Sequence, residues 1–122
     1  MKNFSIGKEI LQILVDADIP ILKNKIFPLI AVPNTTFPFL VYRRIGYRPQ
    51  DNKDYRGEIV LIEMNIASET YAEGVDIANK VADTLIGKET DLIQDINLTN
   101  VSELYLQDTF IQNIQFEIEI KD

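Results

Sequence analysis

The sequence predicts an α+β fold: an antiparallel sheet of mixed strand order, with about four to five strands and two helices packed on one face. Two segments carry apolar residues at helical spacing, and residues 109–120 alternate apolar and polar side chains like a strand with one buried face. The expected order is helix, weak strand, strand pair, helix, strand pair. At 122 residues, the chain is expected to form one domain spanning 1–122.

Two helices are expected. The first covers residues 4–17, with Ser5 as N-cap and Pro20 as the stop signal. Its apolar stripe is Ile6, Ile10, Ile13, Leu14 and Ala17. The second begins at Thr70, which is predicted to form a capping box with Glu73, and it ends at Gly87. Its expected core stripe is Ala72, Val75, Ala78, Ala82 and Leu85, widened by Tyr71 and Val81.

Between the helices, residues 21–36 are punctuated by prolines, which predicts a short edge strand or an extended loop. Residues 38–48 and 58–67 follow as two strands. The polar, turn-rich segment 49–56 is expected to be the loop of this hairpin. Alternation within 38–48 assigns the side chains to two faces. One expected face is Phe39, Val41, Ile45 and Tyr47; the other is Leu40, Tyr42, Arg44 and Arg48.

After the second helix, residues 88–95 are expected to be a polar connector. Residues 96–107 and 109–120 predict two further strands, the first with a bend at Asn100. The residues expected to face the helices from the sheet are Val60, Ile62, Met64, Ile114, Phe116 and Ile118.

The composition argues against catalysis. The chain has no histidine, cysteine or tryptophan, which excludes disulfides, thiol nucleophiles and metal sites with sulfur or imidazole ligands. It has no phosphate-binding glycine loop and no nucleophile elbow. We therefore expect no enzyme, no catalytic residues, no cofactor and no metal site. Acidic residues that do not match the spacing of a calcium loop are interpreted as solvated surface: Glu89, Asp91, Asp95, Glu103, Asp108, Glu117 and Glu119.

Charge and hydropathy limit the partners. The net charge of −7 disfavours tight binding to nucleic acid, although it suits a surface past which DNA slides. No apolar run approaches the ~20 residues that span a bilayer, so no membrane partner is expected. Residues 1–20 lack a signal-peptide pattern, and a cytoplasmic protein is the expectation.

Positive charge gathers around the first predicted hairpin, and these residues are the candidate interface. The set is Arg43, Arg44, Arg48 and Arg56, with Tyr47 and Tyr55 beside them. One interpretation is contact with phosphate or with carboxylates of a partner protein. The other is that the arginines protect an edge strand and pair with Asp51, Asp54 and Glu58. The five tyrosines are read either as interface anchors or as ordinary amphipathic packing.

An ordered set of segments resembles a known family. The segments are 26–29 (IFPL), 37–45 (FPFLVYRRI), 67–73 (ASETYAE), 81–85 (VADTL) and 108–118 (DTFIQNIQFEI). In this order they resemble the small tail-completion proteins of tailed bacteriophages and prophages, also called tail-terminator or head–tail joining proteins. The resemblance spans nearly the whole chain, although no single motif in it is specific. The acidic connector 88–95 departs from the family pattern.

The resemblance implies a non-catalytic ring, commonly a hexamer, that caps the tail tube and joins it to the head. Its implied partners are copies of itself and the tail-tube and head-completion proteins, first in the cytoplasm and then in the virion. The loop at 46–57 matches a projecting part of the family fold. Two other functions remain open on the residues alone: a small ligand-binding or regulatory module without catalysis, and an enzyme that uses only Asp, Glu, Lys and Tyr.

Overall fold

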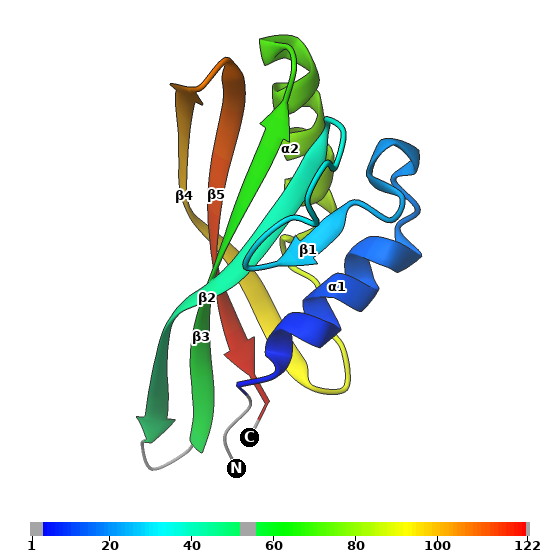
Figure 1. The fold of residues 1–122 in the computed structure, drawn as a ribbon. Coiled ribbons are helices and arrows are strands. Elements are labelled where there is room, and N and C mark those ends of the chain that lie inside the picture. Colours follow the sequence, from blue (N-terminus) through cyan, green and yellow to red (C-terminus); the bar gives the residue numbers. More distant parts are fainter. Residues whose placement is uncertain (1–3, 52–55, 122) are drawn as a thin grey trace.

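The computed structural model describes residues 4–51 and 56–121, and it shows five strands and two α-helices in a layered arrangement (Figure 1). The N-terminal half holds α1 (Ile6–Asp16), a short 3-10 helix η1 (Pro20–Leu22), β1 (Ile26–Pro28) and β2 (Phe39–Asp51). The C-terminal half holds β3 (Arg56–Ser68), α2 (Tyr71–Leu85), β4 (Ile93–Leu106) and β5 (Thr109–Ile120). The strand order is β1-β2-β3-β5-β4.

This topology confirms the predicted α+β class. β1 pairs with β2 in parallel, with Ile26 opposite Leu40, and every other strand pair is antiparallel. β5 lies between β3 and β4, so β4 forms one edge of the sheet. The β2–β3 and β4–β5 hairpins extend toward opposite ends of the molecule (Figure 1). The weak strand predicted within 21–36 is the short edge strand β1.

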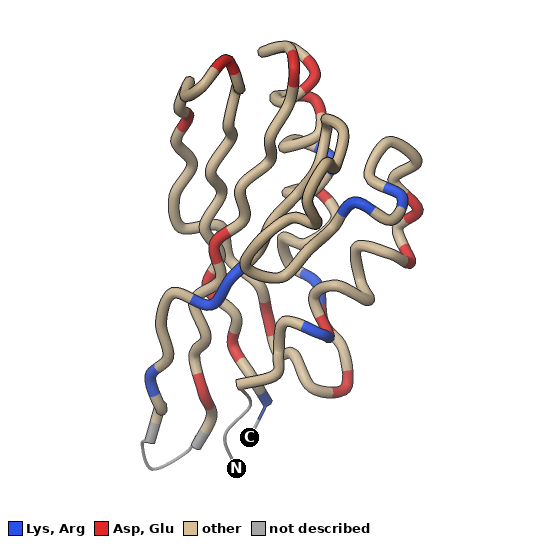
Figure 2. Tube along the Cα trace, in the orientation of Figure 1, with Lys and Arg blue, Asp and Glu red and all other residues tan. Residues whose placement is uncertain are grey.

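Charge is divided across the sheet. Residues 1–56 contain nine of the 12 lysines and arginines, whereas residues 57–122 contain 14 of the 19 acidic residues. Because β1 and β2 occupy one side of the sheet, the division of the sequence becomes a division in space. In Figure 2, lysines and arginines are most frequent over β2 and the segments around α1 and β1, although α1 also carries Glu9 and Asp16, and acidic residues predominate over β3, α2, β5 and β4. We call residues 1–56 the basic half and residues 57–122 the acidic half.

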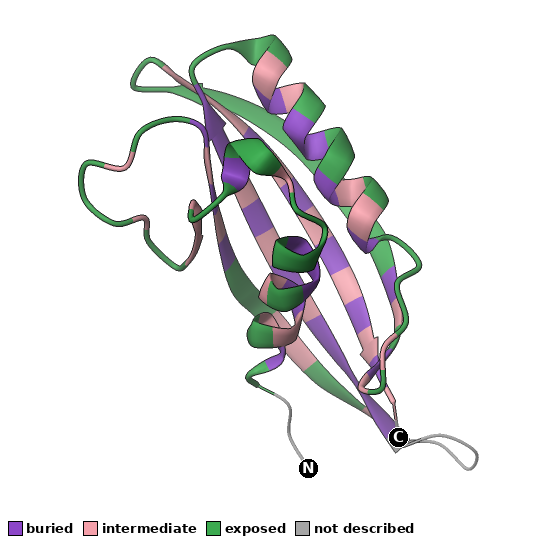
Figure 3. Ribbon diagram, turned by 90° about the vertical axis from the view of Figure 1, so that its right-hand side faces the viewer, coloured by how far each residue is buried: buried purple, intermediate pink, exposed green. Residues whose placement is uncertain are grey.

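The core lies between the sheet and the two helices, which cover the same face (Figure 3). All six predicted sheet residues are buried there, among them Met64 at 0% and Phe116 at 1% exposure. From α1 come Ile6, Ile10, Ile13 and Leu14, as predicted, whereas Ala17 is exposed. Ser5 occupies the N-cap position of α1 but makes no capping hydrogen bond through its side chain.

The predicted stripe of α2 is partly wrong. Ala72 is exposed, and Val75 and Ala82 are only half-buried. The residues that face the sheet are Gly74, Ile77, Ala78, Val81 and Leu85. The N-terminal turn of α2 lies so close to β3 that a Cβ at Gly74 would be 2.5 Å from Ser68 Oγ. A glycine there lets the helix approach and rotates the buried stripe away from Ala72. The Thr70 cap is confirmed, because Thr70 Oγ1 accepts a hydrogen bond from Glu73 N.

Two predicted loops are shorter than expected. The segment 49–56 was predicted to be a loop, but β2 runs to Asp51 and β3 starts at Arg56, with Pro49 opposite Glu58. Pro49 therefore did not end β2, and residues 52–55 of the predicted loop lie outside the described residues. The connector 88–95 likewise ends early, because β4 begins at Ile93. The bend predicted at Asn100 is confirmed by a register irregularity between Leu98 and Asn100.

A β-bulge in β2 overturns part of the predicted face assignment. The pairing of β2 with β3 shifts between Arg44 and Gly46, so Ile45 is skipped and the alternation resets. Tyr47 therefore lies opposite the core residue Val60 and packs on the core side, where Leu40 and Tyr42 also lie. Arg48 is moved to the opposite, helix-free side of the sheet, which we call the open face.

Candidate assembly surface

The predicted arginines are not gathered into one patch. Arg43 lies on the open face, and its Nε donates to Glu63 Oε1 at 2.8 Å. Arg48 is on the same face, where its Nη2 donates to Glu117 Oε1 at 3.0 Å. Arg44 lies on the helix-covered side, because the bulge comes after it. Its Nη1 donates to the backbone carbonyl of Phe4 at 2.9 Å, and its guanidinium sits 4.7 Å from the Phe4 ring centre.

Tyr47 packs locally. Its ring meets Phe4 edge-on at 5.0 Å, and its hydroxyl donates to Glu58 Oε1 at 2.8 Å. Burial, followed by this hydrogen bond, raises the pKa of Tyr47 above its ordinary value. The other two predicted interface residues follow the end of β2 in the sequence. Tyr55 lies outside the described residues, and Arg56 is placed only by its backbone, opposite Asp51 at the end of the hairpin.

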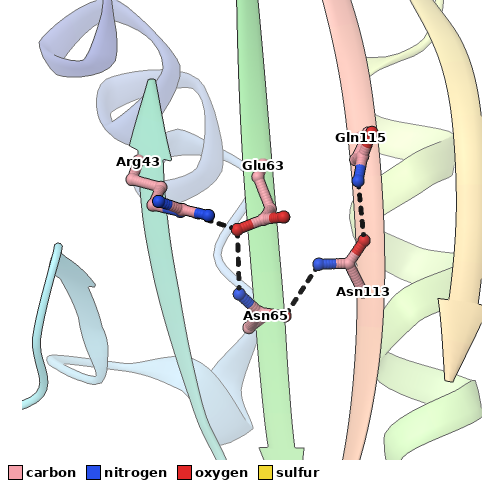
Figure 4. Close-up of polar contacts among 5 residues, drawn as sticks. All are labelled: Arg43, Glu63, Asn65, Asn113 and Gln115. Atoms are coloured by element: carbon pink, nitrogen blue, oxygen red, sulfur yellow. Dashed lines mark hydrogen bonds and ion pairs between the residues drawn. The ribbon is translucent and has the colours of Figure 1, made fainter. Parts of the chain in front are cut away.

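The open face carries a row of polar side chains across the middle of the sheet (Figure 4). From Arg43 the row runs through Glu63 to Asn65, whose Nδ2 donates to Glu63 Oε1 at 3.4 Å. It continues from Asn113 to Asn65 at 2.9 Å and from Gln115 to Asn113 at 3.2 Å. Burial works to raise the pKa of Glu63, but hydrogen bonds led by Arg43 outweigh it and hold that pKa below the usual range. The middle of the open face is therefore polar and internally hydrogen-bonded.

A long run of exposed apolar side chains lies on β4, where the sequence predicted only an ordinary strand; Leu29, Ile30 and Val32, between β1 and β2, are individually more exposed, at 60–79%. Beyond Ile96 every residue of this strand is exposed. The large apolar side chains among them are Leu98, Val101, Leu104, Tyr105 and Leu106, at 40–56% exposure. They occur on both faces of the strand: Leu98, Val101 and Tyr105 pair with residues on the helix-covered side of β5, and Leu104 and Leu106 with residues on its open face. In the sequence, the apolar residues of 98–106 do not alternate strictly with polar ones. This pattern could have indicated the exposed strand, but a fully buried strand shows the same pattern.

On the helix-covered side of this hairpin is a pocket of about 210 Å³, which we call the Glu103 pocket. Its lining residues are Tyr71, Glu103, Leu104, Tyr105, Phe110 and Gln112. Tyr71 Oη and Gln112 Nε2 both donate to Glu103 Oε2, at 2.8 and 3.2 Å. The Phe110 ring lies 4.8 Å from Tyr105 and 6.0 Å from Tyr71. The sequence predicted that Glu103 is part of a solvated acidic surface. It gave no sign of these partners, which become neighbours only through the strand order.

A second pocket, of about 370 Å³, lies between the end of α1, η1 and β1, and we call it the α1–β1 pocket. Its lining is mainly aliphatic, with Leu11, Leu14 and Leu22 among the residues, and also includes Asp18 and Lys23. Within residues 4–51 and 56–121 there is no group of three or more metal-binding side chains. No helix in the same ranges is long and apolar enough to cross a bilayer.

Comparison with known proteins adds one finding. No protein-family model matches the chain, and no curated protein matches it. Among solved structures, the fold is shared with a virion protein. The chain is similar to a chain from the structure described as the virion of a native gene transfer agent particle, with a TM-score of 0.77. The match covers 93% of this chain and 92% of that one at 11% sequence identity, so it shows a common fold.

Proposed function

We propose that this chain is a structural protein of a phage-type particle, and that it forms a ring that caps the tail tube and joins the tail to the head. The observation that carries the proposal is the fold shared with a gene transfer agent virion chain over 93% of this chain. The resemblance of the ordered segments between 26 and 118 to tail-completion proteins points to the same role. The ring would be a hexamer, as that resemblance implies.

The exposed surfaces suit assembly better than chemistry. β4 leaves large apolar side chains in solvent, and such surfaces in folded proteins commonly mark contacts with other proteins. The arginines of the β2–β3 hairpin, with Tyr47 and Tyr55, remain our candidates for contacts with a neighbouring subunit or the tail tube. The net charge of −7 favours a ring through which DNA passes without tight binding.

Electron microscopy of particles tests this role. In a host that produces the particles, deletion of the gene is expected to yield tails of uncontrolled length, or tails separate from filled heads. Antibody labelling of wild-type particles should mark the junction of tail and head. Normal joined particles from the deletion strain would refute the proposal.

The α1–β1 pocket favours one alternative, a small module that binds an apolar ligand. Its volume of about 370 Å³ and its aliphatic lining would suit a small apolar ligand. In that case the protein would be absent from purified particles, and a panel of small apolar compounds would raise its melting temperature. Presence at the tail–head junction together with no thermal shift would exclude this alternative.

A further inference from the structure

The two lateral edges of the sheet differ in charge. β2 belongs to the basic half, and beyond its short pairing with β1 no strand among the described residues pairs with its outer edge from Arg43 to Asp51. β4, at the other edge, belongs to the acidic half. Contact between two copies through the same edge would place like charges together. Contact between unlike edges would place the acidic half of one copy against the basic half of the next (Figure 2).

The β4 edge also lacks the usual protection against strand pairing. Natural edge strands are blunted by lysine, proline, inward charges, bulges or a covering element. The exposed segment 97–106 has no lysine and no proline, and Glu103 is its only charged residue. The single irregularity, between Leu98 and Asn100, lies at its start. A long edge with this much apolar surface is suited to being covered by another chain in an assembly.

The chemistry of the Glu103 pocket specifies a cation. Three aromatic rings line the pocket beside a carboxylate. The face of an aromatic ring is electron-rich and attracts a cation, as does the carboxylate. Tyr71 and Gln112 hold Glu103 Oε2, whereas no described residue bonds Oε1. The hydrogen bond from Tyr71, followed by that from Gln112, lowers the pKa of Glu103 below its ordinary value. The pocket thus holds an oriented negative charge with one oxygen available.

We propose that the Glu103 pocket binds a lysine or arginine side chain from the basic half of a second copy of this chain, and that the β4 edge packs beside it. This inference rests on the proposed self-assembly and names the surface that performs it. The contact joins two different surfaces, so successive copies form a closed ring or a helical array. The pocket sets the register, and the apolar side chains of β4 supply buried area around it.

A matched pair of variants tests the charge. Glu103→Gln keeps the side-chain shape and an acceptor for Tyr71, while Asp91→Asn makes the same charge change on the exposed connector before β4. Sedimentation of the purified proteins across a range of concentration and salt should show wild type and Asp91→Asn associating alike. Glu103→Gln should associate roughly ten- to a hundredfold more weakly, as expected for the loss of a hydrogen bond to a charged group. Unchanged association of a folded Glu103→Gln protein would overturn the proposal.

Cross-linking in assembled particles identifies the partner. A photoreactive amino acid at Tyr105, which is 56% exposed at the pocket wall, should form dimers whose linked peptide lies within residues 1–56. The same group at Ile86, 47% exposed at the end of α2, is the control and should not link to those residues. A link from Tyr105 to residues 57–122 of another copy, or to a different protein, would overturn the proposal while leaving the ring role intact. Absence of the protein from particles would instead refute the proposed function.

Discussion

Replacing Phe116 with alanine tests the assignment of the core directly. Phe116 is 1% exposed, and its neighbours across the sheet are Ile62 on β3 and Leu98 on β4. Truncation of a buried phenylalanine removes its transfer free energy and leaves a cavity, which together cost roughly 3–5 kcal/mol. The upper part of this range is expected here, because two strands and the helices on the same face hold the walls of the cavity in place.

Urea denaturation followed by circular dichroism is the assay. With a slope of about 2 kcal/mol per molar urea, a loss of ~4 kcal/mol lowers the midpoint by about 2 M. Leu104→Ala is the matched control, because Leu104 is 54% exposed on the neighbouring strand and its truncation should change the free energy of unfolding by no more than about 0.5 kcal/mol. A loss below about 1 kcal/mol for Phe116→Ala would show that the strand faces are wrongly assigned.

Three further predictions concern local structure. Thr70→Ala should lower the free energy of unfolding by about 1 kcal/mol in the same urea assay, because Glu73 N loses its capping acceptor. Gly74→Ala should also destabilise, although alanine is the better helix former, because its Cβ would lie 2.5 Å from Ser68 Oγ; a gain in melting temperature would contradict the close approach of α2 to β3. The lowered pKa of Glu63 contributes stability that is present above the unfolded-state pKa and lost as pH falls through the folded-state pKa, so Glu63→Gln should flatten the acid limb of a stability–pH curve. An identical limb in wild type and variant would mean that other carboxylates account for it.

The parts of the fold that could be predicted depend on local signals. The alternation in 109–120 and the Thr70 cap specify β5 and α2 without knowledge of the rest of the chain. The bulge at Ile45 has no such signal, since both faces of β2 carry large side chains and either register looks acceptable. The predicted buried stripe of α2 was partly wrong for a related reason. Gly74 reads as a weak helix residue in sequence, and only its contact distance to Ser68 shows that it faces the sheet.

The candidate surface was harder to predict than the fold, because it depends on which strand becomes the edge. The arginines of 43–48 are adjacent in sequence, but the bulge distributes them over both faces of β2. The Glu103 pocket combines residues from α2, β4 and β5, and the sequence offers no spacing rule that connects them. Strand order also determines that residues 97–106 are exposed, because the same apolar run would be buried in a central strand.

The internal partners of the arginines change what they can contribute to assembly. Arg43 and Arg48, each about half exposed, already pair with Glu63 and Glu117 within the subunit. Exposed ion pairs of this kind are worth about 0–1 kcal/mol, so exchanging them for partners on another subunit adds little affinity and mainly affects orientation and encounter rate. The affinity must then come from apolar burial along β4 and from the Glu103 pocket. An interface with a small apolar anchor and a charged rim is weak between free monomers and becomes strong when several copies are held together on one template. Purified protein is therefore expected to associate weakly and only at high concentration, and a template that holds several copies together would complete the assembly.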